Sequence, residues 1–273
     1  MKKTVIYIVV SLMLAGVFFF GLRSYGAAKA YERTTASLVA KMSPKSLAEF
    51  QLREWAHKLS LGLYKNKKRQ KLERLKRRSL AYKEKSIKMM QYSMFLMGGV
   101  LLCYFILSLQ AFTFFSAVGA GIMLLFGLYT PILMVTIHKE VEYLGDVALS
   151  FESKGVLGSV EKLFASGDSV VAGVILLFSV VIPVLKILSM MFVAVFIKSR
   201  FAHGIVVFFK HLGKWSMVDV FVVATFLVYL TTNNGDVSRA EIEVGLYFFL
   251  AYVIISMMVS LSADRMLHKD KEV

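Results

Sequence analysis

The chain has 273 residues, of which 57% are hydrophobic, and a formal net charge of +15. Several uninterrupted apolar runs reach about 18 residues or more, the length that crosses roughly 30 Å of hydrocarbon. A soluble core does not explain five or six such runs separated by short charged loops, so the composition excludes an ordinary soluble domain. We expect the all-α class, a polytopic helical membrane protein with about six transmembrane helices.

The sequence carries no signature of an enzyme or of a metal site. Its one cysteine, Cys103, stands in an apolar string, and its five histidines have no ligand spacing. A Walker loop, a nucleophile elbow and a dinucleotide-binding motif are all missing from the sequence. We therefore expect no catalytic residue, no metal and no cofactor.

Residues 1–30 resemble a secretory signal. Two lysines precede an apolar stretch at 5–22, and small residues form an A-x-A pattern at 28–30. The apolar stretch is longer than the usual signal core, which favours an uncleaved signal-anchor helix. Cleavage after the A-x-A pattern is the alternative that the sequence leaves open.

Residues 31–88 are polar, basic and helix-prone. Between 23 and 88 the sequence has 19 Lys and Arg against five Glu. Ser43 and Pro44 can begin a helix, Gly62 and Asn66 can turn the chain, and a second basic helix then enters the membrane at Met89. In a membrane protein such a basic helical hairpin favours anionic headgroups or an acidic partner over nucleic acid, and a solvated helix without a ligand is the alternative.

Five further spans follow the hairpin. The first is an additional helix at 89–109, in the segment 89–111. The other four belong to one module at 112–263, and they lie at 112–136, 170–197, 216–231 and 244–263. Residues 198–214 contain four basic residues and no acid, which predicts a cytoplasmic loop, as for the tail at 264–273. The acidic loops 138–168 and 231–243 then lie on the other side. Counting the spans also puts residues 31–88 on that side, which is the periplasm, although their positive charge favours the cytoplasm. The charge rule is weak for segments longer than about 60 residues.

The loop after Pro131 predicts a small external cap of strands and one helix. "VTIHKEVEYLGDVALSFES" alternates like short strands, and "KGVLGSVEKLFASGD" reads as a short amphipathic helix. Its predicted inward side chains are Val156, Val160, Leu163 and Phe164.

The span at 170–197 contains the main candidate site. Lys186 lies about 16 Å from the end of this span at 1.5 Å per residue, which is hydrocarbon depth. A lysine there costs on the order of 2.5 to 3.5 kcal/mol, so a partner or a watery cavity is expected. Pro183 displaces the carbonyl of Ser179, which predicts a kink and a polar spot around these three residues. Snorkelling of Lys186 toward the headgroups is the alternative.

Asp219 is the counter-charge that the sequence offers, because it is the only acid inside a predicted span. Ser216 and Asp219 also form a helix-capping pair, with Trp215 at the headgroup level. Capping and pairing with Lys186 are compatible. Thr225, with Tyr229, could extend a polar stripe deeper, although packing is the simpler role for both.

These segments resemble the paraquat-inducible protein A (PqiA/LetA) family over about residues 112–263. The resemblance rests on "PILMVTIHKEVEYLG", "GVILLFSVVIPVLKIL" and above all "LGKWSMVDVFVVATFLVYL", which matches the pattern W-S-M-x-D-V-F. It implies a four-helix module in the inner membrane of a Gram-negative bacterium. It also implies lipid transfer to or from a periplasmic partner with an MCE domain.

The chain departs from the family pattern in two ways. Typical members carry two modules and cytoplasmic CxxC zinc ribbons, whereas this chain has one module and no CxxC pair. Zinc is therefore not expected, and a path between two modules would need a homo-oligomer. Our hypothesis is a non-enzymatic component of lipid transport with phospholipid as ligand; the alternatives are a membrane scaffold or regulatory subunit, and an ion- or proton-coupled transporter.

Overall fold

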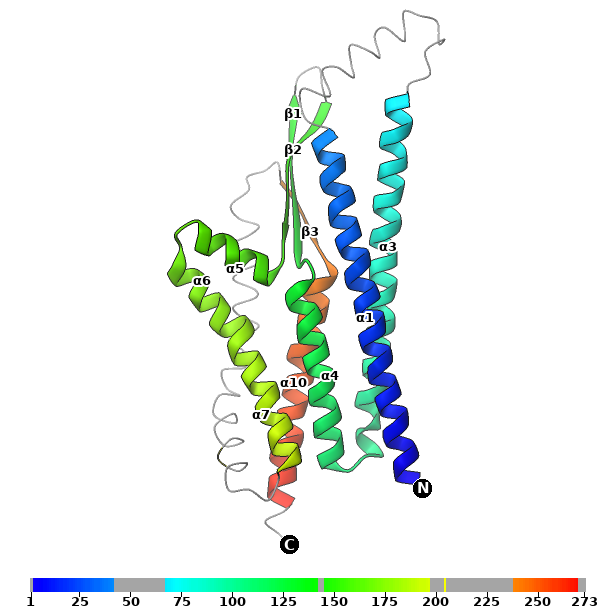
Figure 1. The fold of residues 1–273 in the computed structure, drawn as a ribbon, viewed down its shortest axis with the longest axis vertical. Helices are drawn as coiled ribbons and strands as arrows, with labels where there is room; N and C mark the ends of the chain where they lie inside the picture. The colour runs from blue at the N-terminus through cyan, green and yellow to red at the C-terminus, as the bar shows by residue number, and fades with distance from the viewer. Residues whose placement is uncertain (1, 42–66, 142–144, 197–203, 205–237, 270–273) are drawn as a thin grey trace, which may run out of the picture.

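The computed structural model describes residues 2–41, 67–141, 145–196, 204 and 238–269. The five longest helical segments run side by side, and a small antiparallel sheet stands at one end of the bundle (Figure 1). The helices are α1 (Lys2–Lys41), α3 (Lys67–Leu102), α4 (Leu109–Tyr129), α5 (Val156–Ala165), α6 (Ser169–Leu176), α7 (Ile182–Val195) and α10 (Val244–Lys269). The strands are β1 (Leu133–Val141), β2 (Gly145–Lys154) and β3 (Ser238–Ile242).

Five of these helical segments are long and apolar enough to cross a membrane, and α6 and α7 together form one of them. Their length and composition confirm the prediction of an all-α, multi-pass membrane protein. The predicted span at 216–231 lies outside the described residues. The loop at 198–214 also lies outside them, apart from residue 204.

The predicted boundaries around α4 were wrong by several residues. The span predicted at 112–136 ends at Tyr129, because Thr130 is already extended (φ −86°, ψ 145°) and precedes a proline. At its other end, Ser108 caps the helix by accepting a hydrogen bond from the Ala111 N–H at 3.4 Å. A single turn of 3₁₀ helix at Cys103–Phe105 ends the preceding span.

The sheet has the strand order β2–β1–β3, all antiparallel. The two strands predicted after Pro131 are confirmed as β1 and β2, whereas β3 was not predicted. Pairing of Leu133 with Ile242 brings β3 beside β1. The sheet thus joins the ends of α4 and α10, which are far apart in the sequence.

The predicted amphipathic helix is α5, and one of its four inward side chains was assigned wrongly. Val156 and Val160 are buried and Leu163 packs against the core, but Phe164 is 46% exposed. The first three lie within about 60° of one another around the helix axis, whereas Phe164 lies about 40° beyond Val160, at the exposed edge of this stripe.

The helices α1 and α3 form a long antiparallel pair (Figure 1). α3 passes without a break from the basic segment into the apolar one. Buried hydroxyls join the two helices: Ser24 donates to the Ser86 carbonyl at 2.9 Å, and Ser93 donates to the Val17 carbonyl at 3.0 Å. Such bonds between helices help to hold a pair together where hydrocarbon supplies no hydrophobic drive.

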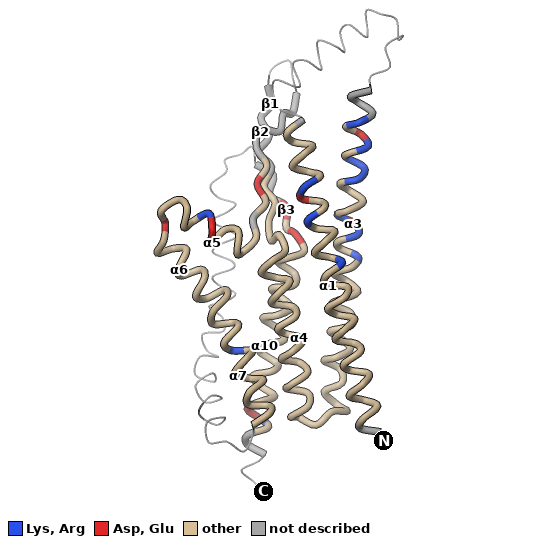
Figure 2. The backbone as a smooth tube through the Cα atoms, viewed as in Figure 1, with Lys and Arg blue, Asp and Glu red and all other residues tan. Residues whose placement is uncertain are grey.

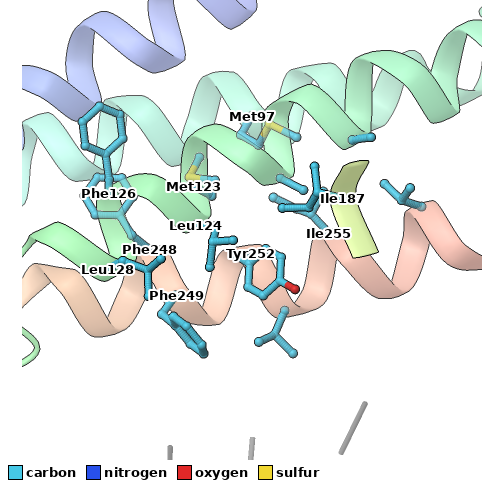
Figure 3. Close-up of a cluster of buried hydrophobic side chains, with 14 of the residues drawn as sticks. Met97, Met123, Leu124, Phe126, Leu128, Ile187, Phe248, Phe249, Tyr252 and Ile255 are labelled. Carbon is cyan, nitrogen blue, oxygen red and sulfur yellow. The ribbon is translucent and has the colours of Figure 1, made fainter. Parts of the chain in front are cut away.

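The core lies mainly between α4 and α10, where large side chains from both helices meet (Figure 3). The rings of Phe126 and Phe248 are 5.6 Å apart. The backbones also come close, since a Cβ on Gly127 would lie 2.9 Å from the backbone N and Cα of Phe249. Only glycine fits at this crossing without moving one helix.

We expect Gly127→Ala to lower the unfolding temperature, because the added methyl meets backbone rather than a movable side chain. Overpacking of this kind typically costs about 1 to 3 kcal/mol. Thermal unfolding of the purified protein in detergent measures the effect. Gly173→Ala in α6 is the matched control, since nothing lies within 4 Å of its added Cβ. Equal unfolding temperatures for the two variants would contradict the close crossing.

Candidate functional site

The polar spot predicted from the sequence lies on the inner face of the α6–α7 span. Ser179, Pro183 and Lys186 are all buried, and they recur at spacings of four and three residues on one side. Leu185 and Leu188, between and after them, are exposed on the opposite side. The span therefore turns its polar residues toward the other helices and its leucines outward.

The helix accommodates Pro183 through a wider turn. Residues Leu177–Val181 form a π turn, in which the Ile182 N–H donates to the Leu177 carbonyl five residues earlier. Proline has no N–H of its own and displaces the carbonyl four residues before it. A π turn at this point spaces the chain around the ring, and such turns are frequent at functional sites.

The Lys186 ammonium reaches α10. Its Nζ donates to the Ser256 Oγ at 3.3 Å, and the Ser256 hydroxyl donates in turn to the Val253 carbonyl at 3.0 Å. Only 6% of Lys186 is exposed. The side chain therefore points into the bundle in this structure. Whether it also pairs with Asp219 stays a prediction, because Asp219 lies outside the described residues.

The depth of this contact follows from both helices. Lys186 lies about 14 Å before the end of α7, and Ser256 lies about 18 Å after the start of α10, at 1.5 Å per residue. A hydrocarbon layer is about 30 Å thick. Both estimates place the ammonium near the middle of the membrane, where a charge is most costly.

Further hydroxyls continue the polar contacts from Ser256 toward the far end of α10. Ser260 donates to the Ser256 carbonyl at 2.9 Å, and the hydroxyls of Thr113 and Ser262 are 2.8 Å apart. Gln110 of α4 donates to the Ala194 carbonyl of α7 at 2.8 Å. Hydrogen bonds thus connect α4 with α7 and with α10 toward this end of the bundle, where Thr113 and Ser262 are buried and Gln110 is exposed.

The remaining predicted site residues cannot be placed. Trp215, Ser216, Asp219 and Thr225 all fall in the segment 205–237, outside the described residues. Sequence reasoning missed Ser256, although a signal was present: three serines recur in "ISMMVSLSAD", within an otherwise apolar helix. Serine is common in packed transmembrane helices, so this signal alone does not single out one of them.

A second polar cluster lies at the sheet end of the bundle and was not predicted. Lys83 of α3 forms an ion pair with Glu241 of β3. Tyr31 of α1 donates to the same carboxylate at 3.4 Å, and the Lys83 ammonium lies 5.6 Å from the centre of the Tyr31 ring. This cluster connects the N-terminal helix pair to the sheet.

Glu243, at the end of this cluster, is buried with 3% of its surface exposed. Its Oε1 has no hydrogen-bond partner among the residues that the structure describes. Burial raises the pKa of this carboxyl to about 7; the nearby Glu241 charge adds to the rise, and the Lys83 charge opposes it. The group therefore titrates near neutral pH.

Comparison with known proteins gives one family and a few relatives. The profile of the family described as "Paraquat-inducible protein A" matches residues 113–271. Proteins described as "Intermembrane transport protein PqiA", from Escherichia coli K12 and Shigella flexneri, are each 28% identical over 123 residues. That match covers 43% of this chain and 29% of each relative, so the chain matches less than a third of their length. No solved structure matches the chain significantly.

The pKa of Glu243 predicts a pH-dependent stability. Folding raises this pKa, so the folded protein binds the proton more tightly, and stability falls as pH rises from about 4.5 to about 7. Glu243→Gln keeps the shape without the charge. We expect the variant to exceed the unmodified protein by about 1 to 3 kcal/mol at pH 8 and by little at pH 5.

Thermal unfolding in detergent at both pH values measures this difference. Glu161→Gln, at an exposed position on α5, is the control and should leave both unfolding temperatures unchanged. A Glu243→Gln variant that is equally stabilised at pH 5 and pH 8 would show that the carboxyl does not titrate in this window.

Proposed function

The chain belongs to the paraquat-inducible protein A family, and from this premise we propose that it is an inner-membrane component of an envelope lipid-transport system. In this role it passes phospholipid to or from a periplasmic partner with an MCE domain. The name of its relatives, intermembrane transport protein, supports the transport part of the proposal. It acts as a carrier or gate rather than as an enzyme.

The observation that carries the proposal is the buried Lys186 ammonium. A phospholipid has an anionic phosphate and two apolar chains, so a path for it through a helix bundle needs a cation beside apolar surface. Lys186 supplies the cation near mid-membrane depth, against Ser256. Ile187 and Met190 of the same helix are buried with it and supply apolar surface beside the cation.

Asp219 then acts as the resident counter-ion of Lys186. A lysine without an anion is unfavourable at this depth. A carboxylate that pairs with Lys186 when no lipid is bound therefore stabilises the lipid-free protein. A lipid phosphate and Asp219 compete for the same ammonium in this scheme. Exchange between the two anions lets a headgroup bind and leave.

A homo-oligomer completes the proposal. The chain matches less than a third of the length of each relative. Its family motifs occur once, which corresponds to one four-helix module. Two copies of the chain could supply the second wall of a lipid path. The two exposed leucines on the outer side of the α6–α7 span offer apolar surface for such a contact.

The first test concerns the two charges. We expect Lys186→Met, which removes the cation, to reduce labelling of the protein by a photoactivatable phospholipid in native membranes by about tenfold, and Asp219→Asn, which removes the competing anion, to raise it. The exchange Lys186→Asp with Asp219→Lys should restore part of the labelling that Lys186→Met loses. Lys162→Met, an exposed lysine paired with Glu152, is the control.

Protein levels and unfolding temperatures must be measured in parallel, because a broken buried pair can destabilise the fold. Full labelling of the Lys186→Met variant, or a loss of labelling in the Asp219→Asn variant, at normal protein level, would exclude the pair as a working site.

The second test concerns the partner. Affinity purification of the full chain from native membranes, followed by mass spectrometry of proteins and lipids, should recover an MCE-domain protein and phospholipid. Recovery of other envelope proteins without lipid would favour a scaffold. Proton or ion flux in liposomes would favour a coupled transporter instead.

A further inference from the structure

The outer part of α3 carries a dense group of exposed cations, which we call the stalk face: Lys71, Arg74, Lys76, Arg77 and Arg78. Between residues 67 and 88 the sequence has eleven Lys and Arg against two Glu. Basic residues follow the upper half of α3 and are missing from its lower half (Figure 2). This part of the chain precedes the region matched by the family profile.

The ion pair between Lys83 and Glu241 marks where α3 leaves the membrane. Glu241 lies three residues before Val244, where the apolar helix α10 begins. Lys83 therefore lies at the level of the headgroups. Lys85 and Lys88 come after Lys83, on the membrane side, where lysine stems reach phosphates.

The stalk face extends beyond the reach of these headgroups. Arg74 and Lys71 lie about 14 and 18 Å farther along α3 than Lys83, at 1.5 Å per residue. The headgroup layer is only about 5 to 8 Å thick on each side, and charges are screened over about 8 Å at physiological salt. The outer cations of the stalk face are thus too far from their own bilayer to be explained by its anionic lipids.

The stalk is also held in one orientation. Thr35 of α1 and Ser79 of α3 have their hydroxyls 3.0 Å apart, within the part of α3 that bears the cations. The Lys83–Glu241 ion pair then fixes α3 to the sheet. Because the helix is already formed before it binds, binding of a partner does not cost the conformational entropy of ordering it.

We propose that the stalk face is a docking surface for the acidic side of a protein that stands away from the membrane. Three of its five residues are arginines, whose planar guanidinium groups bind carboxylates through two parallel hydrogen bonds. The predicted export of residues 31–88 argues against nucleic acid as the partner. This inference goes beyond the proposed function and holds equally for a scaffold that handles no lipid.

A photo-cross-linking amino acid at position 71, on the same side of α3 as Arg74 and Arg78, tests the proposal in the full chain in native membranes. The rest of the stalk face stays intact in this variant. We expect a protein adduct whose cross-linked region is acidic. Arg74→Glu with Arg78→Glu should reduce the adduct at least tenfold, and lysines in place of the partner's cross-linked acids should restore it to this variant.

Lys85→Glu with Lys88→Glu is the matched control, with the same change in charge on the same helix at the headgroup level. It should leave the adduct within about twofold. If the Glu variant does not accumulate, Arg74→Gln with Arg78→Gln replaces it, with a loss expected in the same direction. Cross-links to lipid or nucleic acid only, a protein adduct that survives reversal of the stalk face, or an equal loss in the control would each overturn the proposal.

Discussion

A bilayer has no water to satisfy a polar group, and this constraint explains how the polar residues of the bundle are arranged. An unsatisfied group in hydrocarbon costs several kcal/mol, so a polar side chain is stabilised by a partner on its own helix or on a neighbouring one. Ser93 donates to a carbonyl of α1, Gln110 to a carbonyl of α7, and Lys186 to a hydroxyl of α10. These bonds run between helices, so they also fix which helices are neighbours. The same constraint explains the position of the sheet, whose strands stand at the end of the bundle and not within it.

The N-terminal helix pair is part of the same packed body as the module matched by the family profile. Its ring contacts with α4 lie at both ends of that helix: Tyr7 is 6.0 Å from Phe115, and Phe18 is 5.7 Å from Phe126. At the membrane surface, Tyr31 and Lys83 meet Glu241 of β3. An extension outside the family profile is thus joined to the module by apolar packing inside the membrane and by charges at its edge. The Lys83–Glu241 ion pair joins α3 to the sheet, and the sheet connects α4 with α10.

Lys186 and Glu243 are buried ionisable groups at different depths, and burial disfavours the charged form of both. Lys186, in the middle of the bundle, faces hydroxyls on α10. Glu243 lies just before α10, close to the Lys83 charge, and burial still raises its pKa to about 7. The first places a cation inside an apolar bundle, against a hydroxyl of the neighbouring helix. The second makes the joint between stalk and sheet sensitive to pH, since a proton on Glu243 removes the charge that burial disfavours.

Much of this protein follows from the sequence alone. Apolar runs of sufficient length predicted the spans, since a bilayer demands about 20 apolar residues. Alternation after Pro131 predicted β1 and β2, the spacing of Pro183 and Lys186 predicted a polar spot, and the family motifs predicted the family that the profile identifies. These features are local, because each depends on residues close together in the chain.

The remaining features depend on pairs that are far apart in the sequence, and only the tertiary structure decided them. Nothing near Lys186 indicates Ser256, 70 residues later, as its neighbour, because several serines in α10 have the same local pattern. β3 was missed because a strand of five residues with three charged or polar side chains gives little signal until β1 lies beside it. The ion pair of Lys83 with Glu241 joins residues 158 positions apart. Composition fixed how many charges the stalk carries, whereas the contact with β3 fixed how far from the membrane they stand.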